Sequence, residues 1–180
     1  MSYTGSMRVI GGEFRSRLLK SVPGLDVRPT PDRLREALFN VLAPRIEGAV
    51  FADVYAGTGA VGIEALSRGA ARAIFVEPDR NALRVIRENL KSLGLESRGE
   101  VRQGRALAAI PALEADIFFL DPPYRLDREY KAALELLGRG EPGLVIVQHE
   151  IRRKLAPSYG VLERTRELKQ GDNVLSFYGL

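Results

Sequence analysis

Between residues 49 and 150, short apolar runs alternate with helical segments, and this alternation constrains the fold more than any other feature of the sequence. The apolar runs predict strands at 50–55, 73–76, 100–103, 116–120 and 144–147, and the segments between them predict helices at 60–68, 79–93, near 106 and 128–137. Most of the runs are apolar at successive positions, as in strands that are buried on both faces. The sequence therefore predicts an α/β fold with a Rossmann-like, mostly parallel, doubly wound sheet.

The two ends of the chain depart from this alternation. Gly11-Gly12 separates two short extended segments, which predicts an N-terminal β-hairpin, and Gly171-Asp172 separates the segments that predict a C-terminal antiparallel hairpin. We expect a single domain over residues 1–180, in which 1–6 are a tag or tail and 7–30 form a basic hairpin extension.

A helix is expected directly after the hairpin extension. Thr30 is a residue type that caps helices, and Pro31 suits the first helical position. Pro44 is expected to end this helix, because proline cannot donate the next backbone hydrogen bond.

Composition excludes several kinds of chemistry. The chain has no cysteine and only one histidine, His149. Disulfides, thiolate metal sites, cysteine nucleophiles and multi-histidine metal sites are therefore excluded, and we expect no metal. No apolar run is long enough to cross a bilayer, and the N-terminus lacks a signal pattern, so we expect a cytoplasmic protein with no membrane partner.

Positive charge is concentrated near the N-terminus. Residues 1–36 carry seven Lys or Arg against four Asp or Glu, a net +3 out of +4 for the chain. Such a face suits binding to nucleic-acid phosphates, although an ordinary solvated surface is the alternative. The residues that we expect to contact RNA are Arg8, Arg15, Arg17, Lys20 and Arg33.

A glycine-rich loop follows the first strand of the alternating region. Gly57, Gly59 and Gly62 fit the spacing G-x-G-x-x-G, and Glu77 lies 20 residues beyond Gly57, at the end of the next strand. Glycines allow a tight turn and close approach of a ligand to the backbone, and the acidic residue can accept hydrogen bonds from ribose hydroxyls. A nucleotide-containing cofactor is therefore expected here.

The loop alone does not identify that cofactor. A dinucleotide would place its pyrophosphate over the helix N-terminus, where the carboxylate of Asp53, four residues before Gly57, would repel it. S-adenosylmethionine carries a sulfonium and an ammonium group, so Asp53 favours this cofactor over a dinucleotide but does not decide between the two cofactors. Asp53 could also cap the loop. We place Tyr55, Thr58 and Pro78 in the same cofactor site.

Asp121-Pro122-Pro123-Tyr124 follows another apolar strand, at the edge of the sheet where ligands of such folds bind. The two prolines remove two backbone N–H donors and leave carbonyl acceptors. With a carboxylate and an aromatic ring, this segment suits a planar substrate that carries an amino group: acceptors hold the amine, and the ring stacks on the base. These four residues are the candidate catalytic residues.

Several segments together resemble the RsmD family of bacterial methyltransferases. They are Met7-Arg-Val-Ile-Gly-Gly, the stretch from Arg28 to Asn40, the loop from Asp53 to Gly62, Glu64-Ala-Leu-Ser-Arg-Gly-Ala70, Val76-Glu77 and Asp121 to Tyr124. The four-residue motif is shared with adenine-N6 methyltransferases, whereas the stretch from Arg28 to Asn40 is far more specific. The resemblance covers the chain from Met7 onward.

The resemblance implies a class I S-adenosylmethionine-dependent methyltransferase fold, with S-adenosyl-L-methionine as cofactor. The implied reaction is methylation of the exocyclic N2 of guanine 966 in 16S rRNA, free or within the 30S subunit, by a monomeric enzyme. It further implies that the basic hairpin grips the RNA and that Arg28 and Thr30 lie near the cofactor.

One segment departs from the family pattern. Members usually carry Gly-Asp-Ala after the third strand, and the aspartate accepts from the adenine amino group, whereas this chain has Gly104-Arg105-Ala106. We therefore expect backbone groups of Gly104 to Ala106 to hold the adenine, with Arg105 an alternative phosphate contact. His149 is expected to shape the pocket rather than to act as a base.

Three other functions stay open at this stage. An adenine-N6 methyltransferase on DNA or RNA would use the same four-residue motif, and a non-catalytic RNA-binding assembly factor would use only the basic face. A dinucleotide-dependent oxidoreductase would use only the glycine loop.

Overall fold

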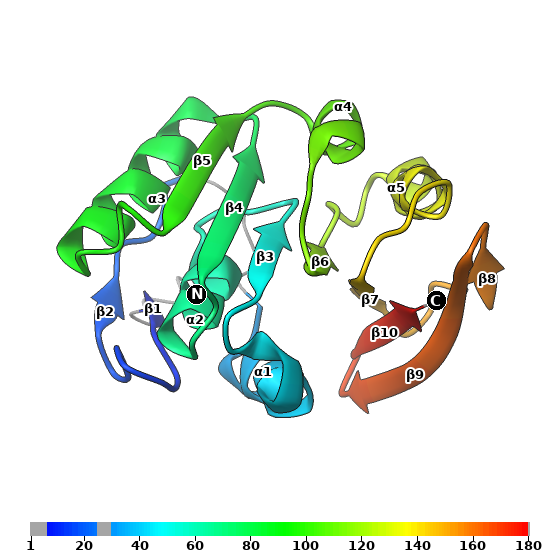
Figure 1. Ribbon diagram of the computed structural model, residues 1–180, viewed down its shortest axis with the longest axis horizontal. Helices are drawn as coiled ribbons and strands as arrows, with labels where there is room; N and C mark the ends of the chain where they lie inside the picture. The colour runs from blue at the N-terminus through cyan, green and yellow to red at the C-terminus, as the bar shows by residue number, and fades with distance from the viewer. Residues whose placement is uncertain (1–6, 25–29, 180) are drawn as a thin grey trace.

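The computed structural model of the chain describes residues 7–24 and 30–179. Within these residues, eight strands form one twisted sheet in the order β5-β4-β3-β6-β7-β10-β9-β8 (Figure 1). The parallel strands are β3 (Val50–Asp53), β4 (Arg72–Glu77), β5 (Gly99–Gln103), β6 (Ile117–Leu120) and β7 (Leu144–Glu150). The antiparallel strands are β8 (Ser158–Tyr159), β9 (Leu162–Gln170) and β10 (Asn173–Gly179).

The position of β3 fixes where a ligand can bind. Strand β3 pairs with β4 on one side and with β6 on the other, so the strand order reverses at this point. In open α/β sheets, such a reversal leaves a crevice at the carboxyl ends of the strands, and ligands bind there. Asp53, at the end of β3, and Asp121, directly after β6, both lie at this edge.

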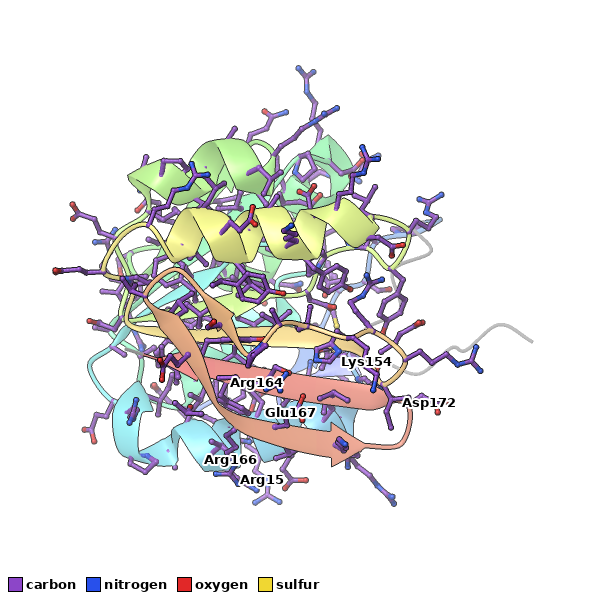
Figure 2. All side chains as sticks on the ribbon, turned by 90° about the vertical axis from the view of Figure 1, so that its right-hand side faces the viewer. Arg15, Lys154, Arg164, Arg166, Glu167 and Asp172 are labelled. Carbon is purple, nitrogen blue, oxygen red and sulfur yellow. The ribbon has the colours of Figure 1, made fainter. Side chains whose placement is uncertain are left out.

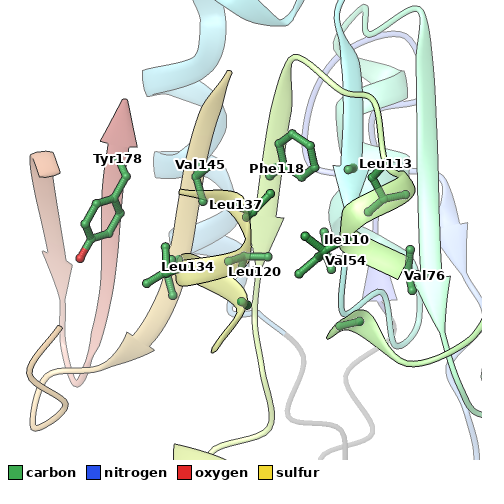
Figure 3. Close-up of a cluster of buried hydrophobic side chains, with 14 of the residues drawn as sticks. Val54, Val76, Ile110, Leu113, Phe118, Leu120, Leu134, Leu137, Val145 and Tyr178 are labelled. Atoms are coloured by element: carbon green, nitrogen blue, oxygen red, sulfur yellow. The ribbon is translucent and has the colours of Figure 1, made fainter. Parts of the chain in front are cut away.

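Helices cover both faces of the sheet, as the apolar strands predict. One face carries α1 (Asp32–Ile46), α2 (Ala60–Ser67) and α3 (Arg80–Ser92), and the other carries α4 (Ala106–Ala109), the 3-10 helix η1 (Ile110–Ala112) and α5 (Asp127–Leu137). Successive side chains of a strand pack on opposite faces: Phe51 joins the core under α1, and Ala52 joins the core under α5. Figure 3 shows the second core, in which Phe118 and Leu120 of β6 meet Leu134 and Leu137 of α5.

The N-terminal hairpin pairs β1 (Met7–Arg8) with β2 (Leu18–Leu19) and lies beside α2 and α3 (Figure 1). Its apolar side chains Val9 and Leu19 are buried against the core under these helices. Gly12 has φ +78°, and a Cβ at this position would lie 2.0 Å from the Ser67 carbonyl oxygen. The close approach of hairpin and α2 therefore requires glycine.

The predicted fold is confirmed, including both terminal hairpins, but the prediction for the first helix is wrong in three details. Pro31 is the N-cap of α1 and not its first helical residue, which is Asp32. The Thr30 side chain does not cap α1, because its hydroxyl donates to Oε1 of Gln148 at 3.1 Å. Pro44 does not end the helix, which continues to Ile46. Ile46 is buried in the core under α1, so packing outweighs the single backbone hydrogen bond that proline removes.

Candidate active site

The glycine loop takes the backbone conformations that its sequence predicts. Gly57 and Gly59 have φ of +54° and +79°, the left-handed region that favours glycine. A Cβ on Gly62 would lie 2.3 Å from the Phe75 ring of β4. Glycine at this third position therefore lets α2 pack closely on the sheet, and α2 begins directly behind the loop.

Glu77 ends β4 and faces this loop. Its carboxylate accepts hydrogen bonds from the backbone N–H groups of Gly57 and Asp79, both at 2.9 Å. The side chain is half-buried, and this burial raises the pKa of Glu77. The Gly104 N–H donates to the Glu77 carbonyl oxygen at 3.2 Å, so the Gly104 to Ala106 segment lies next to the same edge.

Asp53 is the most deeply buried acid of this edge, with 1% of its surface exposed. Among the described residues, one hydrogen bond reaches its carboxylate, from the Gly62 N–H at 3.0 Å. Burial raises the pKa of Asp53 to about 7, the Gly62 hydrogen bond lowers it, and the negative charge of Glu77 raises it further. Removal from water disfavours the charged form, and no cation compensates among the residues that the structure describes.

Asp121 extends from the end of β6 beside Asp53. Burial raises the pKa of its carboxyl to about 7, and the charge of Asp53 adds to this effect. Within residues 7–24 and 30–179, its carboxylate has neither an ion pair nor a hydrogen bond. The edge thus holds two adjacent acids that the described part of the chain leaves without a cation.

The residues after Asp121 form a rigid turn that neighbouring elements hold. The Pro122 carbonyl oxygen accepts from the Tyr130 hydroxyl at 2.9 Å. The Tyr124 hydroxyl donates to Oδ1 of Asn173 at 3.2 Å, and the Tyr124 carbonyl accepts from Arg153 at 3.1 Å. Pro123 is exposed. Carboxylate, carbonyl and aromatic ring lie within four residues, and this set can accept an amine and stack on a planar base.

The other predicted cofactor residues lie around the same edge with different surroundings. The half-buried Tyr55 donates to Oε1 of Glu129 at 3.2 Å, and the buried Thr58 hydroxyl lies 3.4 Å from the Met7 sulfur. Pro78 and Arg105 are exposed. Thr30 contacts Gln148 near the end of β7. Arg28 lies outside the described residues, as do residues 1–6.

The predicted RNA-binding residues are all exposed, but several also make contacts within the protein. Lys20 pairs with Glu88 at 3.0 Å, Arg17 donates to the Ser92 carbonyl at 3.1 Å, and Nε of Arg8 lies 3.8 Å from Asp32. Arg15 and Arg33 project from the hairpin and from α1. Figure 2 shows that the β9 side carries charges of both signs, among them Arg164, Arg166, Glu167 and Asp172.

His149 is a buried residue of β7. It is 2% exposed, and its ring nitrogens lie 2.8 Å from Ser176 Oγ and 2.9 Å from the Glu150 carbonyl oxygen. Burial lowers the pKa of His149. The expectation that it shapes the pocket stays a prediction.

Two groups of residues were missed by the sequence reasoning. Glu64, inside α2, is fully buried beside Arg35 and Arg68. Tyr130 and Arg153 contact the Asp121 to Tyr124 turn. Glu64, Arg35 and Arg68 lie in segments of the family resemblance, but no sequence pattern pairs them, and only the tertiary arrangement brings each group together.

A groove of about 670 Å³ opens at the opposite edge of the sheet, where Ile74, Leu113, Asp116 and Pro142 are among its lining residues. The two carboxyls whose pKa values lie near neutrality are at the carboxyl edge instead. Such perturbed groups accumulate at functional sites, so we place the candidate active site there.

The switch point, the glycine loop and the acceptor turn define a class of protein. This is the class I S-adenosylmethionine-dependent methyltransferase fold, a mostly parallel sheet with antiparallel strands at its C-terminal side. The family model described as "Conserved hypothetical protein 95" matches residues 7–179. The chain belongs to this family, which is the RsmD family of the sequence resemblance.

Two curated relatives are similar to the chain. YlbH of Bacillus subtilis (strain 168), provisionally named an rRNA methyltransferase, is 37% identical over 181 residues, which cover 96% of this chain and 98% of YlbH. Ribosomal RNA small subunit methyltransferase D of Escherichia coli (strain K12) is 42% identical over 125 residues, covering 69% of this chain. That alignment spans 63% of the Escherichia coli protein, less than two thirds of its length.

Two solved structures share the fold. The structure of yhhF from Escherichia coli, provisionally named a methyltransferase, has a TM-score of 0.82 at 35% identity and covers 97% of both chains. An RNA methyltransferase from Salinibacter ruber, in complex with S-adenosyl-L-homocysteine, has a TM-score of 0.66 at 20% identity. It covers 83% of this chain and 91% of its own, and the likeness concerns the fold alone. None of the described helices is both long and apolar enough to span a membrane.

Proposed function

We propose that this protein transfers a methyl group from S-adenosyl-L-methionine to the exocyclic N2 of a guanine, guanine 966, in the 16S rRNA of the small ribosomal subunit. The observation that carries the proposal is the acceptor set at the end of β6: the Asp121 carboxylate and the Pro122 carbonyl, followed two residues later by the aromatic ring of Tyr124. The names of the curated relatives support rRNA as the substrate class.

The residues at the edge fit this cofactor. Asp53 and Asp121 are neighbouring carboxyls whose pKa values burial raises to about 7, and no described side chain neutralises them. A ligand that brings positive charge would favour their ionised forms. S-adenosyl-L-methionine carries two such charges and supplies an electrophilic methyl group when bound. We assign the ribose hydroxyls to Glu77, and the adenine to backbone groups of Gly104 to Ala106.

The chain's own groups then act mainly by positioning. The Asp121 carboxylate and the Pro122 carbonyl accept the two hydrogens of the amine, which directs the nitrogen lone pair toward the methyl carbon. Tyr124 stacks on the extruded base. As the new N–C bond forms and the S–C bond breaks, the nitrogen loses one proton. Asp121, ionised beside the bound cofactor, can accept this proton and pass it to water.

The basic hairpin supplies the proposed contact with RNA. Arg15 and Arg33 are exposed and can reach phosphates, and Arg8, Arg17 and Lys20 lie on the same extension or at its border with α3. We propose that the enzyme acts as a cytoplasmic monomer on 16S rRNA, free or within the 30S particle.

The test is a methylation assay with labelled S-adenosyl-L-methionine and three substrates: 30S particles, free 16S rRNA and duplex DNA. Mass spectrometry of the nucleosides should find N2-methylguanosine from 16S rRNA and no methylated adenine. Methylation confined to adenine would favour an adenine-N6 methyltransferase and overturn the proposed base. RNA binding without any methylation would favour a non-catalytic assembly factor.

A matched pair of variants tests the assigned site. Asp121→Asn should lower kcat by about 10²- to 10⁴-fold, because the amide accepts fewer hydrogen bonds and cannot take the proton. Asp116→Asn makes the same change at the opposite end of β6, where the carboxylate accepts from the Val50 N–H. This control should keep kcat within about threefold. Equal activity of the two variants would contradict the role of Asp121.

A further inference from the structure

The turn from Asp121 to Tyr124 lacks backbone N–H donors at two of its four residues. Its two prolines have no N–H groups, so the backbone of the turn cannot fix itself by donating hydrogen bonds at these positions. The hydrogen bond that closes the turn comes later, from the Leu126 N–H to the Pro123 carbonyl at 2.9 Å. The carbonyls of Pro122 and Tyr124 must therefore be oriented by donors from outside the turn.

Tyr130 supplies the first donor. Its side chain is 1% exposed in the core beneath α5, and its hydroxyl donates to the Pro122 carbonyl oxygen at 2.9 Å. A carbonyl oxygen has two lone pairs, so this bond leaves one of them for a substrate amine. The hydroxyl thus fixes the direction of the acceptor that the proposed reaction uses.

Arg153 supplies the second donor from the segment after β7. Its guanidinium donates to the Tyr124 carbonyl at 3.1 Å and to Oδ1 of Asp127 at 2.7 Å. The same group lies over the Tyr130 ring, with Cζ 4.0 Å from the ring centroid. A planar guanidinium can make these contacts together, because its donors fan out in one plane while its face stacks on an aromatic ring.

The surroundings of Arg153 indicate that these contacts determine its position. Its side chain is 15% exposed, and its Nε is buried without a hydrogen-bond partner among the described residues. A buried donor without a partner is unfavourable, so the contacts of the other guanidinium atoms must offset this cost. Those contacts end on Tyr124, the last residue of the turn, and on Asp127 and Tyr130 in the helix α5 that follows it.

We propose that Tyr130 and Arg153 are positioning residues of the methyl transfer: together they hold the Pro122 carbonyl and the Tyr124 backbone in the orientation that receives the substrate amine. The inference rests on the proposed function, because it assigns a catalytic purpose to the turn. It adds two residues that act through the turn and do not touch the substrate.

Tyr130→Phe tests the first contact, with Tyr178→Phe as a matched control. Tyr178 is also a buried tyrosine whose hydroxyl donates to a backbone carbonyl, that of Ala156 at 2.8 Å, but it lies on β10. Tyr130→Phe should lower kcat by about 10- to 100-fold, because a small misplacement of an acceptor is costly in rate. The KM for RNA and the affinity for S-adenosyl-L-methionine should stay within about twofold. Tyr178→Phe should keep the wild-type kcat.

Arg153→Lys tests the second contact. Lysine keeps the charge, but its ammonium group lacks the planar face that stacks on the Tyr130 ring while one nitrogen, Nη2, donates to both Tyr124 and Asp127. We expect a fall in kcat similar to that of Tyr130→Phe, again with little change in KM. A fully active Arg153→Lys enzyme would contradict the assigned contact.

Hydrogen exchange gives a second readout that does not need activity. The Leu126 amide closes the turn, so a loosened turn should exchange this amide about tenfold faster in Tyr130→Phe and Arg153→Lys, and at the wild-type rate in Tyr178→Phe. Wild-type kcat in Tyr130→Phe, or equal losses in Tyr130→Phe and Tyr178→Phe, would overturn the inference. A wild-type protein that methylates no RNA would overturn the proposed function and, with it, the catalytic purpose of these contacts. Faster exchange in the variants would then still show that the two side chains hold the turn.

Discussion

Glu64 on α2 and Asp53 at the end of β3 are both almost completely buried, yet their surroundings differ in kind. The Glu64 carboxylate accepts from the backbone N–H groups of Ile10 and Gly11 and from Nε of Arg68, each at 2.8 Å. Nε of Arg35 lies 3.8 Å away. Asp53 accepts one hydrogen bond, and its neighbour Asp121 accepts none from the described residues.

This contrast shows for which buried acid the protein itself supplies the hydrogen-bond donors and cations. The partners of Glu64 come from the N-terminal hairpin, from α1 and from α2, so its carboxylate joins three parts of the chain. Arg35 also donates to the Arg8 carbonyl at 2.6 Å, which ties the hairpin to the same cluster. The two aspartates instead face the ligand edge with raised pKa values. A buried acid with partners supports the fold, and a pair without a cation is suited to a cationic ligand.

The largest expected effect comes from removing Glu64 from its cluster with Arg35 and Arg68. Glu64→Ala removes the only fully buried counter-charge of Arg35 among the described residues and leaves it with the exposed Asp32 at 3.2 Å, and it leaves two hairpin N–H groups without their acceptor. We expect a loss of about 3–5 kcal/mol in the free energy of unfolding, as for other buried pairs that lose one partner. Denaturant unfolding followed by circular dichroism measures it.

Glu100→Ala is the control for this experiment. Glu100 also contacts two arginines, Arg72 and Arg102, but at the surface. Exposed pairs contribute little, so its removal should cost less than about 1 kcal/mol. Equal losses for the two variants would remove the distinction between the buried cluster and an ordinary surface network.

A smaller effect is expected from neutralising one acid of the pair Asp53 and Asp121, which has no cation among the described residues. The pKa of Asp121 is raised to about 7 in the folded protein, against 3.8 ordinarily. Ionisation of Asp121 is therefore harder in the folded than in the unfolded chain, and the free energy of unfolding falls as the pH rises from about 4 to about 7. The cofactor-free Asp121→Asn protein should therefore match the wild type at pH 4 and exceed its free energy of unfolding by roughly 2 kcal/mol at pH 8, about half of what the full pKa difference gives, because Asp121 is partly exposed to water. Urea unfolding at the two pH values checks this, and a variant that is destabilised at pH 8 would argue against an uncompensated charge.

The smallest effect on stability is expected where a charge is neither buried nor needed for packing. Arg15 is exposed on the hairpin, so Arg15→Ala should leave the unfolding midpoint unchanged. If the hairpin binds RNA, the variant should weaken binding to 16S rRNA, and the slope of log K against log salt concentration should fall by about 1. An unchanged slope would exclude Arg15 from the RNA contact.

The fold could be predicted because its signals are local. Apolar runs and glycine positions indicate the strands, the parallel sheet and the tight loop at Gly57 and Gly59, and the structure has each of them. The position of Asp121 at the ligand edge follows from the strand before it. The catalytic role of this residue stays a prediction, and so do the roles of the other proposed cofactor and RNA residues.

The remaining features depend on contacts between distant parts of the chain. Glu64 and Arg35 are 29 positions apart, as are Tyr124 and Arg153, and no motif joins either pair. Pro44 illustrates the same limit in one helix, because the burial of Ile46 allows the helix to pass a residue that would end it by local preference. Tertiary packing determined these details, and sequence patterns do not encode it locally.

The central claim is that a cationic cofactor compensates the negative charges of Asp53 and Asp121. The release of protons when this cofactor binds tests the claim most directly. Titration calorimetry at pH 7, in buffers of different ionisation enthalpy, measures the protons released when S-adenosyl-L-methionine binds. Because a cation lowers the raised pKa values of both acids, we predict release of on the order of one proton. S-adenosyl-L-homocysteine, which lacks the sulfonium charge, should release fewer, and Asp121→Asn should reduce the difference between them. Equal proton release with the two ligands would contradict the claim.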